Sequence, residues 1–283
     1  MNVGNGAIIR ASDVSRGQQS LELAADVVIV GSGASGATAA RVLSEAGLDV
    51  VLVEEGPYIR PDELRSDVFT NARRVWRDLG FQLAEGRSMI GLLQGVCVGG
   101  STAINGAIVH RLPEAIWDNW RATTPIEALT DLGALHRVYD QLDHELSVAP
   151  APDEVLGRNN ELMREACANL GWQGNPIRRN VSGCRGSAHC LQGCPTERRQ
   201  SMDVSYVPRA LRQGARLVVG CRVGRVRFEG ARAVAVEGEL GHDDGGSIDV
   251  TVRARTAVCL AASAVQTPNI LRKSGLGRRY PWL

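Results

Sequence analysis

A glycine-rich hexapeptide between two apolar segments constrains the fold of this chain more than any other feature. Val27–Val30 is a continuous apolar run, as expected of a strand that is buried on both faces. The chain continues with Gly31-Ser32-Gly33-Ala34-Ser35-Gly36, and Ala37–Ala46 then places apolar residues on one helical face. A strand, a glycine turn and a helix in this order predict the start of a βαβ unit whose helix N-terminus faces bound phosphate groups.

A second strand completes the predicted unit. Asp49–Val53 is again mostly apolar and ends at Glu54, which lies 18 residues beyond Gly36. A carboxylate at this place can accept a hydrogen bond from a ribose hydroxyl. A glutamate here, rather than an arginine, favours an unphosphorylated adenosine ribose, and therefore FAD or NAD over NADP. Glu55 is a second candidate contact, although an acid at a strand end can equally be solvated.

The remaining sequence predicts a mixed α/β organisation. Residues 1–24 are polar and irregular, and residues 174–200 are rich in glycine, proline and cysteine, which predicts mainly loop. The expected helices span 61–82, 126–147, 154–171 and the segment from Thr267-Pro268 to the stop at Gly275. The expected strands are three antiparallel ones around 223–228, 234–236 and 248–252, and a buried one at Ala257–Ala261.

Two further clusters carry chemistry. Residues 95–106 read GVCVGGSTAING, in which paired glycines precede two hydroxyl residues. Backbone N–H groups of such a turn can point at an anion, which suits a second phosphate or ring contact. A glycine turn that caps a helix through Ser101 is the alternative interpretation. Residues 263–277 read SAVQTPNILRKSGLG, which on its own predicts only a capped helix after a buried strand.

In this order, the three segments resemble the glucose–methanol–choline (GMC) family of FAD-dependent oxidoreductases. GSGASG with VEEGP at 53–57 is similar to the family's adenosine-binding start. VGGSTAIN at 98–105 resembles its first signature, which lies along the flavin, and residues 263–277 resemble its second. The resemblance covers residues 25–277. It implies an α/β fold made of a FAD-binding, Rossmann-like domain with an antiparallel β-meander and part of a substrate domain.

Domain limits and cofactor contacts follow from the resemblance. The expected parts are an N-terminal arm (1–24), a first FAD-binding part (25–110), a helical and loop insertion belonging to the substrate domain (111–200) and a second FAD-binding part (201–283). GCRVGRV at 220–226 resembles the strand whose backbone meets the adenine, which implies this role for Val223. The implied cofactor-binding residues are Gly31, Ser32, Gly33, Ala34, Ser35, Gly36, Glu54, Glu55, Val98, Gly99, Gly100, Ser101, Asn105, Gly106, Ala107 and Val223.

Three positions depart from the family's pattern. Val96 stands where arginine or another polar residue is common. Ser263 follows Ala261 and Ala262 where glycine is usual. Ile104 occupies the position at which some members attach the flavin covalently through a histidine, so the FAD is expected to be non-covalent.

Three of the seven cysteines form a C-x5-C-x3-C-P pattern at Cys184, Cys190 and Cys194. The spacing lacks the close CxxC pairs and clear fourth ligand of a structural zinc site, and a disulfide is disfavoured in the cytosol. It resembles the cysteine-rich loop of the sugar-alcohol and glucose dehydrogenase branch of the family. Some members there hold a three-iron cluster that passes electrons from flavin to a cytochrome. An iron–sulfur cluster and unliganded structural cysteines both remain as interpretations.

The charge balance limits the expected partners. With 32 basic and 31 acidic residues the net charge is +1, which gives no electrostatic footprint for nucleic acid. No stretch approaches the ~20 consecutive apolar residues of a transmembrane segment, and the N-terminus shows no secretory signal. We therefore expect a cytoplasmic protein. A small-molecule alcohol or sugar substrate, a C-terminal complement chain and an electron-acceptor subunit are the candidate partners.

The resemblance also implies what these residues lack. Family members pass the substrate's hydroxyl proton to a histidine of the C-terminal half and its hydride to the flavin, whereas this sequence ends six residues after Gly277. We therefore expect no catalytic residue here, although His110 is the histidine nearest to a flavin motif. The expected activity is oxidation of the CH–OH group of an alcohol, sugar or polyol. The alternatives are a non-catalytic FAD-binding remnant of a truncated reading frame and an NAD-dependent dehydrogenase, which fits only the first motif.

Overall fold

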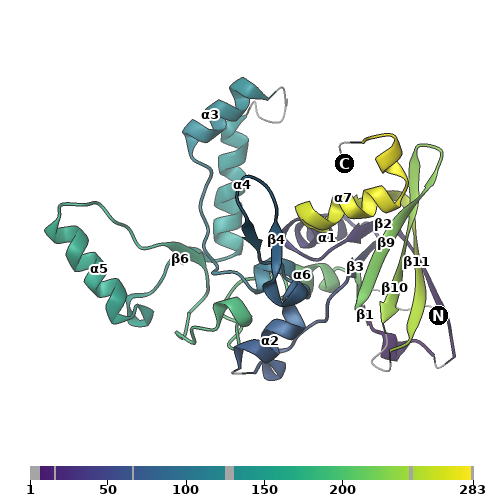
Figure 1. The fold of residues 1–283 in the computed structure, drawn as a ribbon, viewed down its shortest axis with the longest axis horizontal. Helices are drawn as coiled ribbons and strands as arrows, with labels where there is room; N and C mark the ends of the chain where they lie inside the picture. Colours follow the sequence, from purple (N-terminus) through teal and green to yellow (C-terminus); the bar gives the residue numbers. More distant parts are fainter. Residues whose placement is uncertain (1–6, 16, 66, 125–130, 242–244, 282–283) are drawn as a thin grey trace. The chain divides into compact units, whose positions relative to one another are not determined.

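The polypeptide forms two compact units whose segments alternate along the sequence (Figure 1). The computed structural model describes residues 7–15, 17–65, 67–124, 131–241 and 245–281. The first unit comprises residues 1–104, 191–195 and 201–283, and the second comprises residues 105–190 and 196–200. The first unit is therefore discontinuous in sequence, and the second is inserted between its glycine-rich start and its later strands.

A mixed sheet forms the centre of the first unit. Within the described residues its order is β1 (Ile8–Ile9), β8 (Arg216–Val219), β3 (Val50–Glu54), β2 (Ser20–Val30), β11 (Ser247–Leu260), β10 (Arg232–Gly241) and β9 (Cys221–Glu229). The neighbours from β1 to β11 pair in parallel, whereas β11, β10 and β9 pair antiparallel. The predicted α/β class with an antiparallel meander is confirmed. Because β2 and β3 are central and parallel, their carboxyl ends meet at one edge.

The segment predicted as an irregular arm contributes to this sheet, so that part of the prediction is wrong. β1 pairs with β8, with Ile8 opposite Leu217. β2 begins at Ser20, well before the apolar run, and its first half alternates between exposed and buried side chains. Leu21 and Leu23 are buried in the core. Their spacing of two residues is the sequence pattern that indicates a strand here, and a search for continuous apolar runs misses it.

One long strand replaces two predicted ones. The sequence predicts separate strands at 248–252 and 257–261, but β11 runs through both. Its first half pairs with β10 and its whole length pairs with β2, with a shift in register between Ala254 and Ala257. A bulge absorbs the change in phase, so the strand continues where the alternating pattern is interrupted.

The described residues of the first unit contain four α-helices. They are α1 (Ala34–Glu45), α2 (Val68–Val75), α6 (Tyr206–Arg212) and α7 (Ser263–Lys273). α1 packs against α6 and β3, and α7 packs against β9. The predicted start of α7, with Thr267 as N-cap and Pro268 as first helical residue, is wrong, because the helix begins five residues earlier at Ser263 and contains Pro268.

The helix predicted over 61–82 is also wrong. The segment consists of a 3₁₀ turn at Pro61–Glu63, α2 and a second 3₁₀ turn at Arg77–Gly80. Asp78 and Leu79 have φ values of +48° and +55°, a region that a right-handed helix cannot enter.

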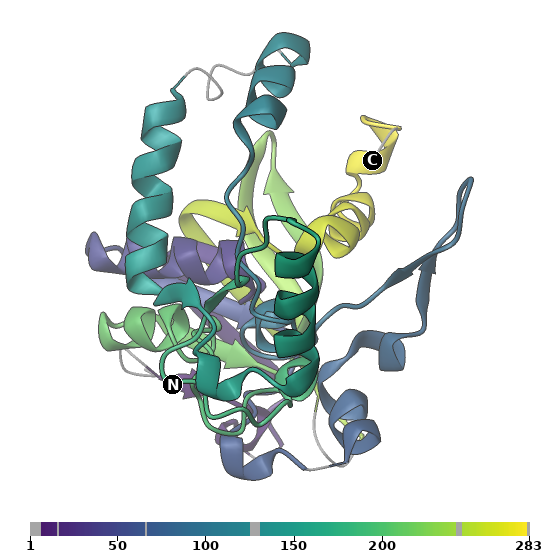
Figure 2. The same ribbon diagram turned by 90° about the vertical axis from the view of Figure 1, so that its left-hand side faces the viewer.

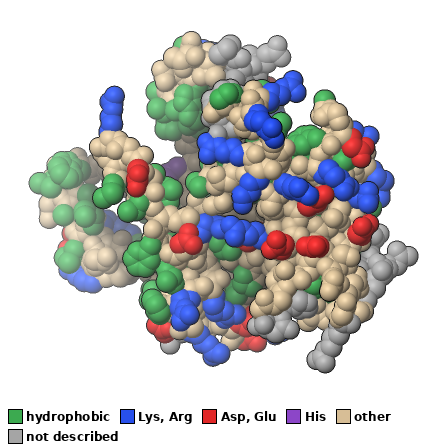
Figure 3. Space-filling view, turned by 45° about the vertical axis from the view of Figure 1, so that its right-hand side comes forward, with side chains coloured by type: hydrophobic (Ala, Val, Ile, Leu, Met, Phe, Trp, Pro, Cys, Tyr) green, Lys and Arg blue, Asp and Glu red, His purple; other side chains and the backbone are tan. Residues whose placement is uncertain are grey.

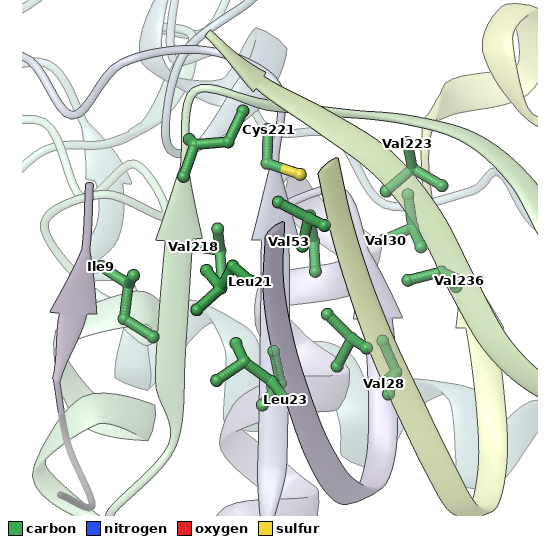
Figure 4. Close-up of a cluster of buried hydrophobic side chains, with 14 of the residues drawn as sticks. Ile9, Leu21, Leu23, Val28, Val30, Val53, Val218, Cys221, Val223 and Val236 are labelled. Atoms are coloured by element: carbon green, nitrogen blue, oxygen red, sulfur yellow. The ribbon is translucent and has the colours of Figure 1, made fainter. Parts of the chain in front are cut away.

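Branched apolar side chains from adjacent strands fill the core of the sheet. Figure 4 shows Val30 of β2, Val53 of β3 and Val218 of β8 beside one another in this cluster. All three are at most 4% exposed. The meander adds Val223 and Val236 to the same cluster. β9, the strand expected from the sequence to meet the adenine, therefore shares a core with β2, the strand that precedes the glycine turn.

A narrow hairpin belongs to the first unit as well. Figure 2 shows β4 (Gln82–Ala84) and β5 (Ile90–Leu92) as a projecting two-stranded arm. Basic and acidic side chains are interspersed over the face of the molecule that Figure 3 presents. Within the described residues, no helix combines the length and the apolar character that crossing a membrane requires.

The second unit is mainly helical. It contains α3 (Glu114–Thr123), α4 (Leu132–Glu145), β6 (Val148–Pro150), α5 (Arg158–Asn169) and β7 (Arg178–Asn180), and β6 pairs antiparallel with β7. α4 and α5 confirm the helices predicted within 126–147 and 154–171, although 126–130 lies outside the described residues. α3 is a helix that the sequence pattern did not predict. Residues 174–200 are mainly loop, as predicted.

We predict that Gly238→Ala destabilises the first unit. A Cβ atom there would lie 2.5 Å from the carbonyl oxygen of Arg222 and 2.9 Å from Cα of Val223, both in the paired strand β9. Such overpacking costs about 1–3 kcal/mol of unfolding free energy. Gly241 lies in the same strand with nothing within 4 Å of its Cβ position. Gly241→Ala is therefore the matched control, and equal urea midpoints for the two variants would contradict this packing.

Candidate functional site

The turn after β2 is so closely packed that two of its three motif glycines admit no side chain. A Cβ at Gly36 would lie 1.8 Å from the carbonyl oxygen of Gly31. Gly31 has a φ of +95°, and its own Cβ would lie 2.5 Å from the carbonyl oxygen of Ala261. Nothing lies within 4 Å of the Cβ position at Gly33, which precedes α1. Protein packing therefore requires Gly31 and Gly36, whereas Gly33 keeps open space in front of the helix N-terminus.

A buried carboxylate joins this turn to the end of β3. Glu54 is 6% exposed, and its Oε2 accepts hydrogen bonds from Ser32 N (2.9 Å) and Ser32 Oγ (2.6 Å). Oε1 accepts one hydrogen bond from Gly56 N at 2.9 Å. Since each carboxylate oxygen can accept two bonds, Oε1 keeps an acceptor position for a ligand hydroxyl.

Burial changes the acidity of this group. Desolvation raises the pKa of Glu54 above its ordinary value of 4.5, against the lowering effect of its hydrogen bonds from Ser32 and Gly56. The negative charge of Glu55 raises it further. Glu54 therefore becomes protonated at a higher pH than a solvated glutamate does.

The second glycine segment packs directly on the first. Gly99 N donates to Ser32 Oγ at 3.0 Å, so one serine hydroxyl bridges Glu54 and this segment. Gly100 has a φ of +52°, and a Cβ there would lie 3.0 Å from Cα of Gly33. Only glycine permits this conformation and approach together.

The helix-capping alternative for Ser101 is wrong. Ser101 lies inside a 3₁₀ turn, Gly100–Ala103, which has no side-chain cap. Its Oγ instead accepts a hydrogen bond from Gly95 N at 3.0 Å. The Ser101 hydroxyl therefore holds the backbone at Gly95 close to the glycine pair.

These segments enclose a cavity of about 300 Å³ within the first unit. Of the residues expected to bind the cofactor, its lining contains Gly31, Gly33, Ala34, Ser35, Glu54, Glu55, Gly100, Ser101 and Val223. The lining residues that no sequence motif assigned to the cofactor include Arg77, Gln94, Gly95, Arg222, Gln266, Asn269 and Lys273. Arg222 and Lys273 lie within the family-like motifs, but no local pattern marks Arg77. Among the described residues, no histidine lines this cavity.

The other expected residues are placed differently. Ser32, Gly36, Val98 and Gly99 support the cavity from behind its lining. Asn105, Gly106 and Ala107 fall in the second unit. There Asn105 Oδ1 accepts a hydrogen bond from Ala107 N at 2.8 Å, and Ala107 has a φ of +58°. Their assignment to the cofactor stays a prediction.

The iron–sulfur hypothesis for Cys184, Cys190 and Cys194 is not supported. The described residues contain no group of three or more His, Cys, Asp or Glu side chains arranged to hold a metal ion. Cys190 Sγ accepts a hydrogen bond from Arg179 Nη2 at 3.0 Å. Cys184 Sγ accepts a hydrogen bond from Gly186 N at 3.5 Å, and none of the seven cysteines, all of which the structure describes, forms a disulfide.

Ser263, one of the departures from the family pattern, adopts a strained conformation at the cavity wall. Its φ is +76°, in the left-handed region that favours glycine. Its Oγ accepts hydrogen bonds from Val265 N (3.3 Å) and Gln266 N (3.2 Å), which compensates part of the strain at the start of α7.

We predict opposite effects for two substitutions at this position. Ser263→Gly removes the strained Cβ and raises the free energy of unfolding by about 1 kcal/mol. Ser263→Ala keeps the strain and loses the hydroxyl, so it lowers stability. Urea titrations of both variants test this, and a Gly variant that is no more stable than the Ala variant contradicts the strain.

Comparison with known proteins agrees with this architecture. The family model described as GMC oxidoreductase matches residues 25–281. An uncharacterized GMC-type oxidoreductase of Mycobacterium tuberculosis is 39% identical over 254 residues, covering 89% of this chain and 39% of the relative. A long-chain-alcohol oxidase of Arabidopsis thaliana is 27% identical over 92% of this chain and 35% of its own length. This chain therefore spans less than two fifths of the length of either relative.

Among solved structures, a FAD-dependent oxidoreductase from Chaetomium thermophilum superposes with a TM-score of 0.62. It is 19% identical, and the match covers 89% of this chain and 47% of that one. At this identity the likeness establishes a shared fold.

Proposed function

Because the chain belongs to the GMC oxidoreductase family, we propose that its first unit binds FAD non-covalently. The chain would then be the flavin-holding part of an oxidoreductase acting on the CH–OH group of an alcohol, sugar or polyol. One observation carries the proposal. A single cavity is lined by Gly33, which has open space at its Cβ position, by Gly100, whose backbone is left-handed, and by the buried carboxylate of Glu54.

The residues of the cavity fit the cofactor's adenosine diphosphate half. No protein atom lies within 4 Å of the Gly33 Cβ position, so there is room for a diphosphate at the N-terminus of α1. Backbone N–H groups and the helix dipole favour an anion there. The free acceptor position on Glu54 Oε1 suits a ribose hydroxyl. Val223 would offer its backbone to the adenine from β9.

When bound, FAD supplies the acceptor for the hydride that leaves the alcohol carbon. The described residues that line the cavity would bind and orient the cofactor. They include no histidine that could take the hydroxyl proton of the alcohol. We therefore assign the base, the substrate contacts and the electron acceptor to groups outside this cavity. The names of the relatives support an alcohol as the substrate class.

The sharpest test is Gly33→Ala. Gly33 has a φ of −66° and a ψ of −167°, which alanine adopts freely, and its Cβ would meet no protein atom. We expect this variant to melt like the unmodified chain but to lose the flavin absorbance that the unmodified chain retains after purification. An unmodified chain that folds and takes up no FAD at micromolar concentration would falsify the proposal.

The acidity of Glu54 gives a second prediction. An ionised carboxylate accepts the ribose hydroxyl bond more strongly than a neutral one. Because burial raises its pKa above 4.5, ADP affinity should be constant at neutral pH and fall as the pH is lowered towards and below that raised value. Calorimetric titrations with ADP from neutral to mildly acidic pH check this. Glu54→Gln should bind ADP weakly at every pH, and an equal slope in both proteins would contradict the assignment.

A further inference from the structure

Glu55 is not a free acid at a strand end. Its Oε2 and Oε1 accept hydrogen bonds from Arg77 Nη2 (2.6 Å) and Nη1 (3.2 Å). Arg222 Nε lies 3.6 Å from Oε1. Both carboxylate oxygens of Glu55 therefore face guanidinium groups.

The ion pair is enclosed, and it forms part of the cavity wall. The side chains of Arg77 and Glu55 are 15% and 30% exposed, and both line the cavity. A bidentate pair of hydrogen bonds to both terminal nitrogens fixes the plane of the guanidinium, which a single hydrogen bond does not do. The backbone of Arg77 is held as well, because its N–H donates to the carbonyl oxygen of Gln94 at 2.9 Å.

Two donors of this fixed guanidinium remain for a ligand. Nη1 and Nη2 each carry two N–H groups, and the pairing with Glu55 uses one of each. The Nε–H is buried and makes no hydrogen bond within the part of the chain that the structure describes. Because Nε has no accessible surface, it cannot donate to a ligand in the cavity, and the remaining Nη–H groups are the donors that Arg77 can offer there.

The charges of the lining point the same way. Its cations are Arg77, Arg222 and Lys273, the only lysine in the sequence, and its acids are Glu54 and Glu55. The wall is therefore net positive by one charge when both acids are ionised. A ligand that places phosphate oxygens near this wall is favoured over a neutral nucleoside.

We propose that Arg77 binds the adenosine diphosphate half of the cofactor by donating a remaining Nη–H to a ligand oxygen. Glu55 is its positioning residue and touches the cofactor only through Arg77. This rests on the proposed FAD site. It replaces the direct contact expected of Glu55 from the sequence and adds a residue that no motif marks.

The test measures ADP and adenosine binding by calorimetry to the flavin-free chain, together with its melting temperature. Arg77→Lys keeps the charge but has no planar guanidinium that Glu55 could hold through two nitrogens. We expect ADP to bind about tenfold more weakly or worse, as for loss of a hydrogen bond to a charged group. Glu55→Gln should weaken ADP binding in the same direction, because it releases the guanidinium.

A second ion pair provides the matched control. Arg74 and Glu63 are joined at 3.2 Å, are 35% and 39% exposed, and are absent from the cavity lining. Arg74→Lys and Glu63→Gln should leave ADP affinity unchanged. If Arg77→Lys does not fold, Glu55→Asp takes its place, since it keeps the charge and withdraws the carboxylate by one methylene.

The outcomes separate the two proposals. An Arg77→Lys protein that binds ADP like the unmodified chain overturns the role of Arg77 while the FAD site stands. A melting temperature that falls in Arg77→Lys with unchanged ADP affinity identifies the pair as structural only, and equally overturns it. If the unmodified chain binds neither ADP nor FAD, both proposals fail.

Discussion

The buried hydrogen bonds between Glu54 and Ser32 are the interaction on which the candidate site depends. Ser32 donates to Glu54 through both its backbone N–H and its hydroxyl, and that hydroxyl also accepts from Gly99. Three segments far apart in the sequence therefore meet at one side chain. The carboxylate is costly to bury, as its raised pKa shows, and its remaining acceptor position is the feature that a ligand hydroxyl would satisfy.

Local signals explain which parts were predictable from the sequence. The glycine turn, the strand ends on either side of it and the meander follow from steric and periodic rules that act over a few residues. The role of Gly36 could be foreseen because helix and strand must touch there, and the 1.8 Å approach to Gly31 confirms that reason.

The errors arose where distant contacts override local pattern. The helix expected over 61–82 is broken at Asp78 and Leu79, whose left-handed backbone no propensity suggested. Arg77, directly before that break, pairs with Glu55 at the cavity wall. The cysteine spacing left an iron–sulfur cluster and unliganded cysteines as alternatives, and the described residues do not support the cluster.

The unbroken course of β11 has a consequence for how the first unit can open. One strand runs from the meander to Leu260, directly before Ala261 at the cavity wall, and it is paired to β2 along its length. Within the described residues, β11 continues from its pairing with β10 to the turn that precedes α7. Because β11 joins the antiparallel meander to the parallel strands, we expect these two parts of the sheet to unfold as one cooperative unit.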